Sequence, residues 1–209
     1  MQWTPGHPAP WAGDPTPSSI ALDPLLARIR KRGDGQSPAR LFEGARASAV
    51  LIALFDGDHG AEVLLTRRAW HLRSHRGEVC FPGGRQDVGE TPTQTALREA
   101  HEEVLLDPSH VTVVGELDHL ATVASYSLIV PIVARLYRRP VLSAGTSEVD
   151  RIFTTPLVDF LRADTFREER WTRDSVTFPV TFFELDDETV WGATARLLRD
   201  LLVLATERG

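Results

Sequence analysis

Three glutamates, Glu99, Glu102 and Glu103, lie within five consecutive positions near the middle of this 209-residue chain. In a helix they fall at i, i+3 and i+4, and therefore on one side of the cylinder. Exposed like charges at this spacing repel by only about 0.2–0.5 kcal/mol per pair, so a solvated acidic face is one interpretation. In a partly closed cleft the repulsion rises to about 3 kcal/mol at an effective dielectric of 20, and a cation is then required.

The available donors indicate which cation such a patch would hold. Carboxylate oxygens are hard ligands, Cys80 is the single cysteine, and the histidines are not clustered. This donor set favours Mg²⁺ or Mn²⁺ over zinc. The residues alone therefore predict either a site for a hard divalent ion or a solvated acidic surface.

A helix over residues 91–106 is predicted to carry the glutamates. Thr91 is a favourable N-cap, Pro92 suits the first helical position, and Gln94 stands three residues after the N-cap, as in a capping box. Apolar side chains at helical spacing can face a core, namely those of Leu97, Ala100 and Val104. Local sequence thus specifies where this helix begins and which residues pack against the protein.

Strands and further helices are predicted around this helix. Apolar runs bounded by turn residues predict strands over residues 48–55, 61–68, 77–84, 111–123 and 127–137, and a strand hairpin over 172–185. Helical spacing of apolar residues predicts helices over 20–31, 155–162 and 191–208. This irregular alternation favours an α/β or α+β fold in which helices cover both sides of a mixed sheet.

Composition limits the classes of partner and the compartment. The chain is 42% hydrophobic and 25% charged, without a secretory signal or an apolar run long enough to cross a membrane, so we expect a soluble cytoplasmic protein. A net charge of −6 argues against nucleic-acid and membrane partners. Proline-rich residues 1–19 are expected to be flexible, 20–46 to form a helix and linker, and 47–209 to form the main domain.

The stretch from residue 84 to residue 106 resembles the signature of the Nudix hydrolase family. That signature is a glycine, five residues, a glutamate, seven residues, and then Arg-Glu-apolar-x-Glu-Glu-x-Gly-apolar. The matching residues are Gly84, Glu90, Arg98, Glu99, Ala100, Glu102, Glu103 and Leu106. Leu105 stands where the family has glycine, so helix termination is expected to fall to Asp107 and Pro108, because a residue before proline is pushed out of helical geometry.

The resemblance implies a Nudix fold, with a mixed sheet between helices, and Mg²⁺- or Mn²⁺-dependent cleavage of a diphosphate linked to another group. Divalent ions would neutralise the diphosphate oxygens and activate a water. By resemblance, Glu99 and Glu103 are metal ligands, and Glu102 is a third ligand or the general base.

Other residues are implied to support this site. Glu90 and Arg98 would form an ion pair that orients the helix, with Glu90 also able to reach metal. Gly83 and Gly84 would form a tight turn that brings the backbone near the metal and the phosphate, or a purely structural turn. Glu148, on a later loop, would complete the metal site or act as the base.

Residues 64–84 resemble the additional motif that marks coenzyme A pyrophosphatases within the family. The motif reads Leu-Leu-Thr-x-Arg-small-x-x-Leu-Arg-x-His-x-Gly-x-Val-x-Phe-Pro-Gly-Gly, and this sequence fills every fixed position. Arginine and histidine can donate hydrogen bonds to phosphate oxygens. Arg68, Arg73 and His75 are therefore candidates for substrate binding, with Arg76 a weaker one. The alternative for each is a surface ion pair or a structural hydrogen bond.

The resemblance predicts hydrolysis of coenzyme A or acyl-CoA to adenosine 3′,5′-bisphosphate and 4′-phosphopantetheine or its acyl form. One alternative is hydrolysis of another nucleoside diphosphate derivative, such as ADP-ribose or a dinucleoside polyphosphate. Another is a Nudix domain that binds a nucleotide without hydrolysing it. Homodimers are common in the family, so a homodimer is one expected assembly.

Overall fold

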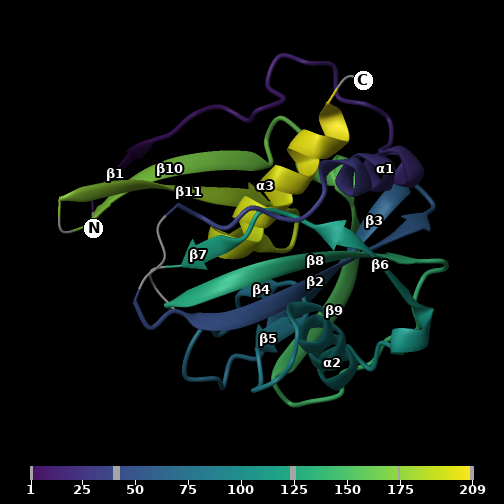
Figure 1. Cartoon of the computed structure of the whole chain (residues 1–209). Helices are drawn as coiled ribbons and strands as arrows, with labels where there is room; N and C mark the ends of the chain where they lie inside the picture. Colours follow the sequence, from purple (N-terminus) through teal and green to yellow (C-terminus); the bar gives the residue numbers. More distant parts are fainter. Residues whose placement is uncertain (1, 40–42, 123–125, 174, 208–209) are drawn as a thin grey trace.

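The computed structural model describes residues 2–39, 43–122, 126–173 and 175–207. Residues 1, 40–42, 123–125, 174 and 208–209, which the predicted segments include, lie outside the described residues. A sheet lies between helix α2 (Pro92–Val104) on one side and helices α1 (Leu22–Arg32) and α3 (Gly192–Thr206) on the other (Figure 1). Within the described ranges, no helix combines the length and the hydropathy needed to span a bilayer.

The large sheet is mixed, as predicted. Its strands are β2 (Arg46–Gly57), β3 (Gly60–Arg68), β4 (Val79–Cys80), β5 (Gly83–Arg85), β6 (Val111–Glu116), β7 (Leu120–Thr122), β8 (Ser127–Leu136) and β9 (Val149–Pro156). The order is β4-β3-β2-β8-β6, and β5, β7 and β9 pair with β2, β8 and β3. Strands β2 and β8 run parallel, while the other pairs are antiparallel. The predicted sheet between helices is therefore confirmed.

A smaller antiparallel sheet lies beside helix α3. Its strands are β1 (Gln2–Pro5), β10 (Phe166–Arg173), β11 (Val176–Glu184) and β12 (Thr189–Trp191), in the order β1-β10-β11-β12. The hairpin predicted over residues 172–185 is present, but its first strand begins earlier, at Phe166, and the registered pairs extend from Phe166 to Arg173. The short helix predicted over residues 155–162 is present as the 3₁₀ helix Leu157–Leu161.

Alternation along strand β3 buries both faces of the large sheet. Val63 and Leu65 lie in the core shared with α1 and α3, whereas Leu64 lies in the core shared with α2. Successive side chains of a strand point to opposite faces. The pairing of β3 with β9 shifts register between the last two residues of β3, Arg67 and Arg68, which make contacts with different groups. The end of β3 therefore contributes side chains to both sides of the sheet.

The N-terminal segment follows the surface of the domain. Strand β1 pairs with β10, and Trp11 is buried, with its ring centroid 5.5 Å from that of Phe166 and 6.3 Å from that of Phe183. Trp3 is exposed. These contacts fix the path of the segment, while its expected flexibility and the predicted domain bounds stay predictions.

Helix α2 ends through Leu105, which takes the left-handed conformation with φ 54° and ψ 31°. Its backbone N–H donates to the carbonyl oxygen of His101 at 3.0 Å. The prediction that Asp107 and Pro108 terminate this helix was wrong. Asp107 instead caps the following 3₁₀ helix by accepting a bond from the Ser109 N–H at 2.8 Å. A side chain with a Cβ in this conformation stores about 1–2 kcal/mol of strain.

Replacing Leu105 with glycine is expected to raise the free energy of unfolding by about 0.5–1 kcal/mol and to leave turnover unchanged. Glycine removes the strain, and little burial is lost because Leu105 is 48% exposed. Urea denaturation measures the change, with Leu106→Ala as a control. Leu106 is buried, so its truncation should lower stability by about 2–5 kcal/mol. A lower urea midpoint for Leu105→Gly than for the wild type would contradict the strain argument.

Candidate active site

The capping box at the start of α2 orients the three glutamates. The Thr91 hydroxyl accepts a bond from the Gln94 N–H at 3.2 Å, and the Gln94 side-chain oxygen accepts one from the Thr91 N–H at 2.8 Å. Glu103 is only 7% exposed, and the Glu99 side chain is 17% exposed. The Glu102 side chain is 52% exposed. The helix therefore encloses Glu99 and Glu103 and leaves Glu102 at the rim.

Two glycines lie directly against the enclosed carboxylates. The Gly83 N–H donates to Oε2 of Glu103 at 3.2 Å. A Cβ on Gly84 would lie 2.5 Å from the Cδ and Oε1 atoms of Glu99, so only glycine lets this carboxylate approach the backbone. Strand β5 brings both glycines to this place by pairing with β2. The glycine turn and the helix thus form one site.

Arg98 holds the surrounding carboxylates together. Its Nε and Nη2 atoms donate to the two oxygens of Glu90 at 2.7 and 3.1 Å. Its Nη1 atom donates to Glu99 at 2.8 Å and to Glu102 at 3.1 Å. Nη2 also donates to the carbonyl oxygen of Arg85, the last residue of β5, at 3.1 Å. This one guanidinium ties α2 to the glycine turn and neutralises part of the acidic cluster.

The carboxylates have different proton affinities. Burial raises the pKa of Glu103 to about 7, although the bond from Gly83 opposes the shift. Burial also raises the pKa of Glu99, against the bond from Arg98. The two bonds from Arg98 and that from Thr95 lower the pKa of Glu90 to about 2. Glu90 is therefore the stably ionised partner of Arg98, Glu99 shares the same guanidinium, and Glu103 forms no ion pair with another described residue.

The carboxylate oxygens of the site are chemically suited to a hard divalent ion. Within the part of the chain that the structure describes, no three Asp, Glu, His or Cys side chains converge as a set that could hold a metal ion. Arg98 binds oxygens of both Glu99 and Glu102 in this arrangement. Glu99 and Glu103 still supply poorly solvated carboxylate oxygens, the ligand type that Mg²⁺ and Mn²⁺ prefer. Glu102 was predicted as a third ligand or the base, and in the structure it is bound to Arg98.

Arg68 and Glu148 form an ion pair whose two charges act on Glu103. Nη2 of Arg68 donates to Oε2 of Glu148 at 3.3 Å, and the Ala69 N–H donates to the Glu148 carbonyl oxygen at 2.7 Å. Both charges act on Glu103, whose pKa Arg68 lowers and Glu148 raises. The structure therefore brings these two candidates, from β3 and from the residue before β9, within electrostatic range of Glu103.

Arg73 and His75 lie on the loop between β3 and β4. Both are exposed, and His75 has a φ of 53°. The His75 Nδ1 atom lies 2.9 Å from Oε2 of Glu78 in the same loop. The hydrogen bonds and ion pairs of these two residues include none to α2 among the described residues. Their predicted substrate contacts stay predictions, as do the catalytic and metal-binding roles of the other candidates.

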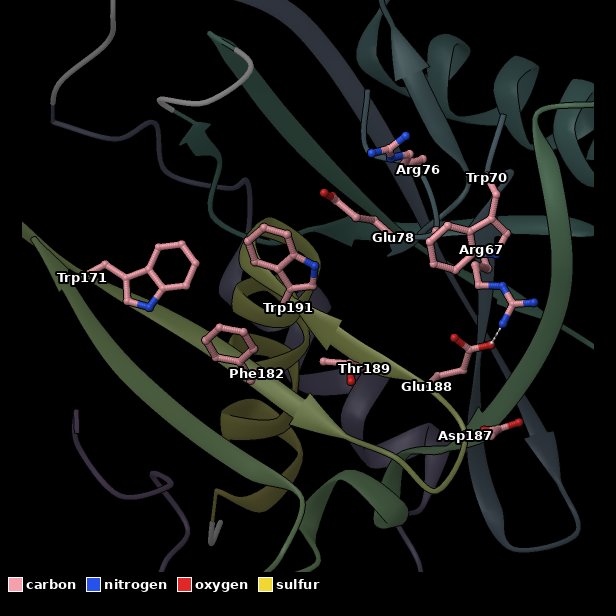
Figure 2. A pocket seen from close by; sticks show the side chains of 11 residues that line it. Arg67, Trp70, Arg76, Glu78, Trp171, Phe182, Asp187, Glu188, Thr189 and Trp191 are labelled. Carbon is pink, nitrogen blue, oxygen red and sulfur yellow. Dashed lines mark hydrogen bonds and ion pairs between the residues drawn. The ribbon is translucent and has the colours of Figure 1, made fainter. Parts of the chain in front are cut away.

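A cavity of about 560 Å³ lies on the other face of the sheet, and the sequence had not indicated it. Its lining includes Trp70, Arg76, Trp171, Phe182, Glu188 and Trp191 (Figure 2). Trp70 stands at a position that the motif over residues 64–84 leaves free, so the motif did not mark it, and only the structure shows that its ring is exposed. The other rings come from distant strands, so no local pattern joins them.

Comparison with known proteins identifies related sequences. Residues 45–141 match the model of the NUDIX domain. The chain is 36% identical to Nudix hydrolase 3 of Caenorhabditis elegans over 174 residues, which cover 76% of this chain and 72% of that protein. It is 36% identical to the Nudix hydrolase NudL of Escherichia coli over 184 residues, which cover 88% of this chain and 94% of that protein. The crystal structure of RenU, a Nudix hydrolase from M. smegmatis, is similar with a TM-score of 0.47 and 24% identity, over 54% of this chain and 71% of that one.

Proposed function

The chain belongs to the Nudix hydrolase family, and from this membership we propose that it hydrolyses the diphosphate of coenzyme A or of an acyl-CoA. The observation that carries the choice of substrate is the stretch over residues 64–84, which fills every fixed position of the coenzyme A pyrophosphatase motif. The charge of Arg68, which lowers the pKa of Glu103, supports it, since an arginine in electrostatic range of this carboxylate can bind a phosphate of the substrate.

The reaction adds one water across the diphosphate. The water oxygen bonds to one phosphorus, the bond from that phosphorus to the bridging oxygen breaks, and the released proton passes to the solvent. The products are adenosine 3′,5′-bisphosphate and 4′-phosphopantetheine or its acyl form. When bound, Mg²⁺ or Mn²⁺ supplies charge neutralisation and lowers the pKa of the attacking water.

Each charged residue has a part in this proposal. Glu99 and Glu103 hold the divalent ion, and Glu102 is a third ligand or the base that accepts the proton of the water. Glu148 is the alternative base, and it becomes available when Arg68 turns from it to a phosphate oxygen.

The remaining candidates support the site. Glu90 and Arg98 keep α2 against the glycine turn, in which Gly83 and Gly84 let the backbone approach the reacting groups. Arg73 and His75 can reach substrate phosphates from the loop between β3 and β4. The proposal places the enzyme in the cytoplasm, without a nucleic-acid or membrane partner, and allows a homodimer.

Turnover of defined substrates tests the proposal. Purified protein with Mg²⁺ or Mn²⁺ is incubated with coenzyme A, an acyl-CoA, ADP-ribose and a dinucleoside polyphosphate, and products are followed by mass spectrometry. We expect both halves of coenzyme A to appear as products. The kcat/KM for coenzyme A should be at least about tenfold higher than the values for ADP-ribose and for the dinucleoside polyphosphate. Faster cleavage of ADP-ribose or of the dinucleoside would transfer the assignment to that substrate. Binding without turnover of any compound would indicate a regulator.

A further inference from the structure

Three aromatic rings form one wall of the cavity on the α1–α3 face of the sheet. Phe182 and Trp191 are stacked, with centroids 6.1 Å apart and an interplanar angle of 12°, and the ring of Trp171 lies 6.2 Å from each (Figure 2). The Trp171 ring N–H donates to Glu169, and the guanidinium of Arg167 lies 4.0 Å from the Phe182 centroid. Contacts with neighbouring side chains therefore hold the rings of this wall in place.

A fourth ring lies across the cavity from this wall. Trp70 is 64% exposed, and Figure 2 shows it on the opposite side from Trp191. Its indole rests on Gly77, where a Cβ would lie 2.4 Å from the ring. An exposed tryptophan that faces an aromatic wall is suited to a flat ligand, because stacking uses the faces of both partners. The volume of about 560 Å³ falls within the range of roughly 300–1,000 Å³ for small-molecule sites.

The charged side chains around the cavity indicate which charge a flat ligand could carry. The Glu188 carboxylate accepts bonds from Arg67 and Arg151 at 2.7 Å each, and Asp187 pairs with Arg151 at 2.6 Å. These carboxylates are thus neutralised. Arg76 contributes an exposed guanidinium that pairs with no carboxylate among the described residues. Glu78, the third carboxylate of the lining, lies 2.9 Å from Nδ1 of His75. Arg76 is therefore available to bind a phosphate carried by a flat ligand.

The cavity and the carboxylate cluster meet at the end of strand β3. Arg67 reaches Glu188 on the cavity side, and the next residue, Arg68, reaches Glu148 on the side of α2. The loop that follows contributes Trp70 to the cavity and leads back into the glycine turn through β4. A substrate that crosses this edge of the sheet can place a diphosphate near Arg68 and its nucleobase on the cavity side.

We propose that this cavity binds the nucleobase end of the substrate, with the base between Trp70 and Trp191 and a phosphate of the nucleoside near Arg76. The proposal rests on the proposed function, because it concerns the adenosine half of the same diphosphate substrate. It assigns substrate recognition to Trp70 and Arg76, at positions that the motif over residues 64–84 leaves free, and to Trp191, which lies outside both motifs.

The test measures the affinity of each half of coenzyme A by isothermal titration calorimetry. The ligands are adenosine 3′,5′-bisphosphate and 4′-phosphopantetheine, and the variants are Trp70→Ala and Trp191→Leu. Tyr137→Ala, which removes an exposed aromatic ring that does not line the cavity, is the control. Circular dichroism checks folding. Trp70→Ala is decisive if Trp191→Leu is unstable, because Trp70 is largely exposed.

We expect the Kd of adenosine 3′,5′-bisphosphate to rise on the order of tenfold in each folded cavity variant, since that is the scale of stacking one base on an aromatic ring. The Kd of 4′-phosphopantetheine should not change, and the control should match the wild type for both ligands. An unchanged Kd of the bisphosphate in Trp70→Ala, or a loss confined to 4′-phosphopantetheine, would overturn the proposal.

The two proposals can fail separately. If the wild type does not cleave coenzyme A but the cavity variants lose affinity for the adenosine nucleotide, the substrate assignment fails and the nucleobase site stands. If coenzyme A is cleaved but these affinities do not change, the nucleobase site fails and the activity stands.

Discussion

Replacing Glu103 with glutamine is expected to lower kcat for diphosphate hydrolysis by about 100- to 1,000-fold while the protein stays folded. Glu103 is buried one helical turn from Glu99, and its Oε2 atom accepts the Gly83 N–H. Glutamine has the same shape and can accept that bond, but it carries no charge with which to hold a divalent ion. Activity at saturating substrate across a range of Mg²⁺ concentrations measures the loss.

The same replacement is expected to stabilise the metal-free protein at neutral pH. Burial raises the pKa of Glu103 from 4.5 to about 7, so the folded state binds this proton more tightly than the unfolded chain. Below pH 4.5 both states are protonated. Between pH 4.5 and 7 the unfolded chain ionises first, so the stability of the wild type falls, by about 3 kcal/mol in total.

Urea denaturation in EDTA at several pH values measures this effect. The difference between Glu103→Gln and the wild type should grow from pH 4.5 to 7 and then stay constant. Glu43→Gln removes the same charge from an exposed position and should change neither turnover nor stability. Wild-type Mg²⁺-dependent turnover in Glu103→Gln would refute the assigned role. A stability difference independent of pH would refute the argument from burial.

Replacing Gly84 with alanine is expected to lower kcat by about 100-fold with little loss of stability. The added Cβ would lie 2.5 Å from the Glu99 carboxylate, so that carboxylate must move. The obstacle is the end of a flexible side chain, so the backbone can keep its path. The Mg²⁺ concentration for half-maximal activity should rise as well, because a displaced Glu99 is a poorer ligand.

The neighbouring glycine provides the contrast. A Cβ on Gly83 would lie 2.4 Å from the carbonyl oxygen of Ala49 in β2, which is backbone that cannot move without breaking the pairing of β5. Gly83→Ala should therefore lower the melting temperature strongly, whereas Gly84→Ala should not. Wild-type activity in Gly84→Ala would show that the contact with Glu99 has no part in catalysis.

Local sequence sufficed to predict the helix and the strand pattern. Thr91, Pro92 and Gln94 define the start of α2 through bonds within four residues, and the structure contains that capping box. The apolar spacing of helix α1 and the hairpin of β2 and β3 were likewise predicted and are present. These features depend on periodicity and on short-range bonds, both of which can be read along the chain.

Longer-range details could not be read in this way. Leu105 adopts a left-handed conformation that its own residue type disfavours, and the helix end is nevertheless closed there. The bonds from Arg98 to Glu99 and Glu102 have the right sequence spacing, but a solvated rotamer was equally compatible with the sequence. The Arg98 rotamer is also held by Glu90 and by the carbonyl oxygen of Arg85, whose position depends on the pairing of β5 with β2.

The sequence by itself determined the Nudix membership, the acidic helix and its glycine turn, because the residue types and spacings of that chemistry lie within one continuous stretch. Only the tertiary structure decided which glutamates are enclosed, and that Arg68 and Glu148 pair within electrostatic range of Glu103. It alone assembled Trp70, Trp171 and Trp191 around one cavity. The physical reason is that burial and contact depend on how strands far apart in the chain pair, and no local pattern records that pairing.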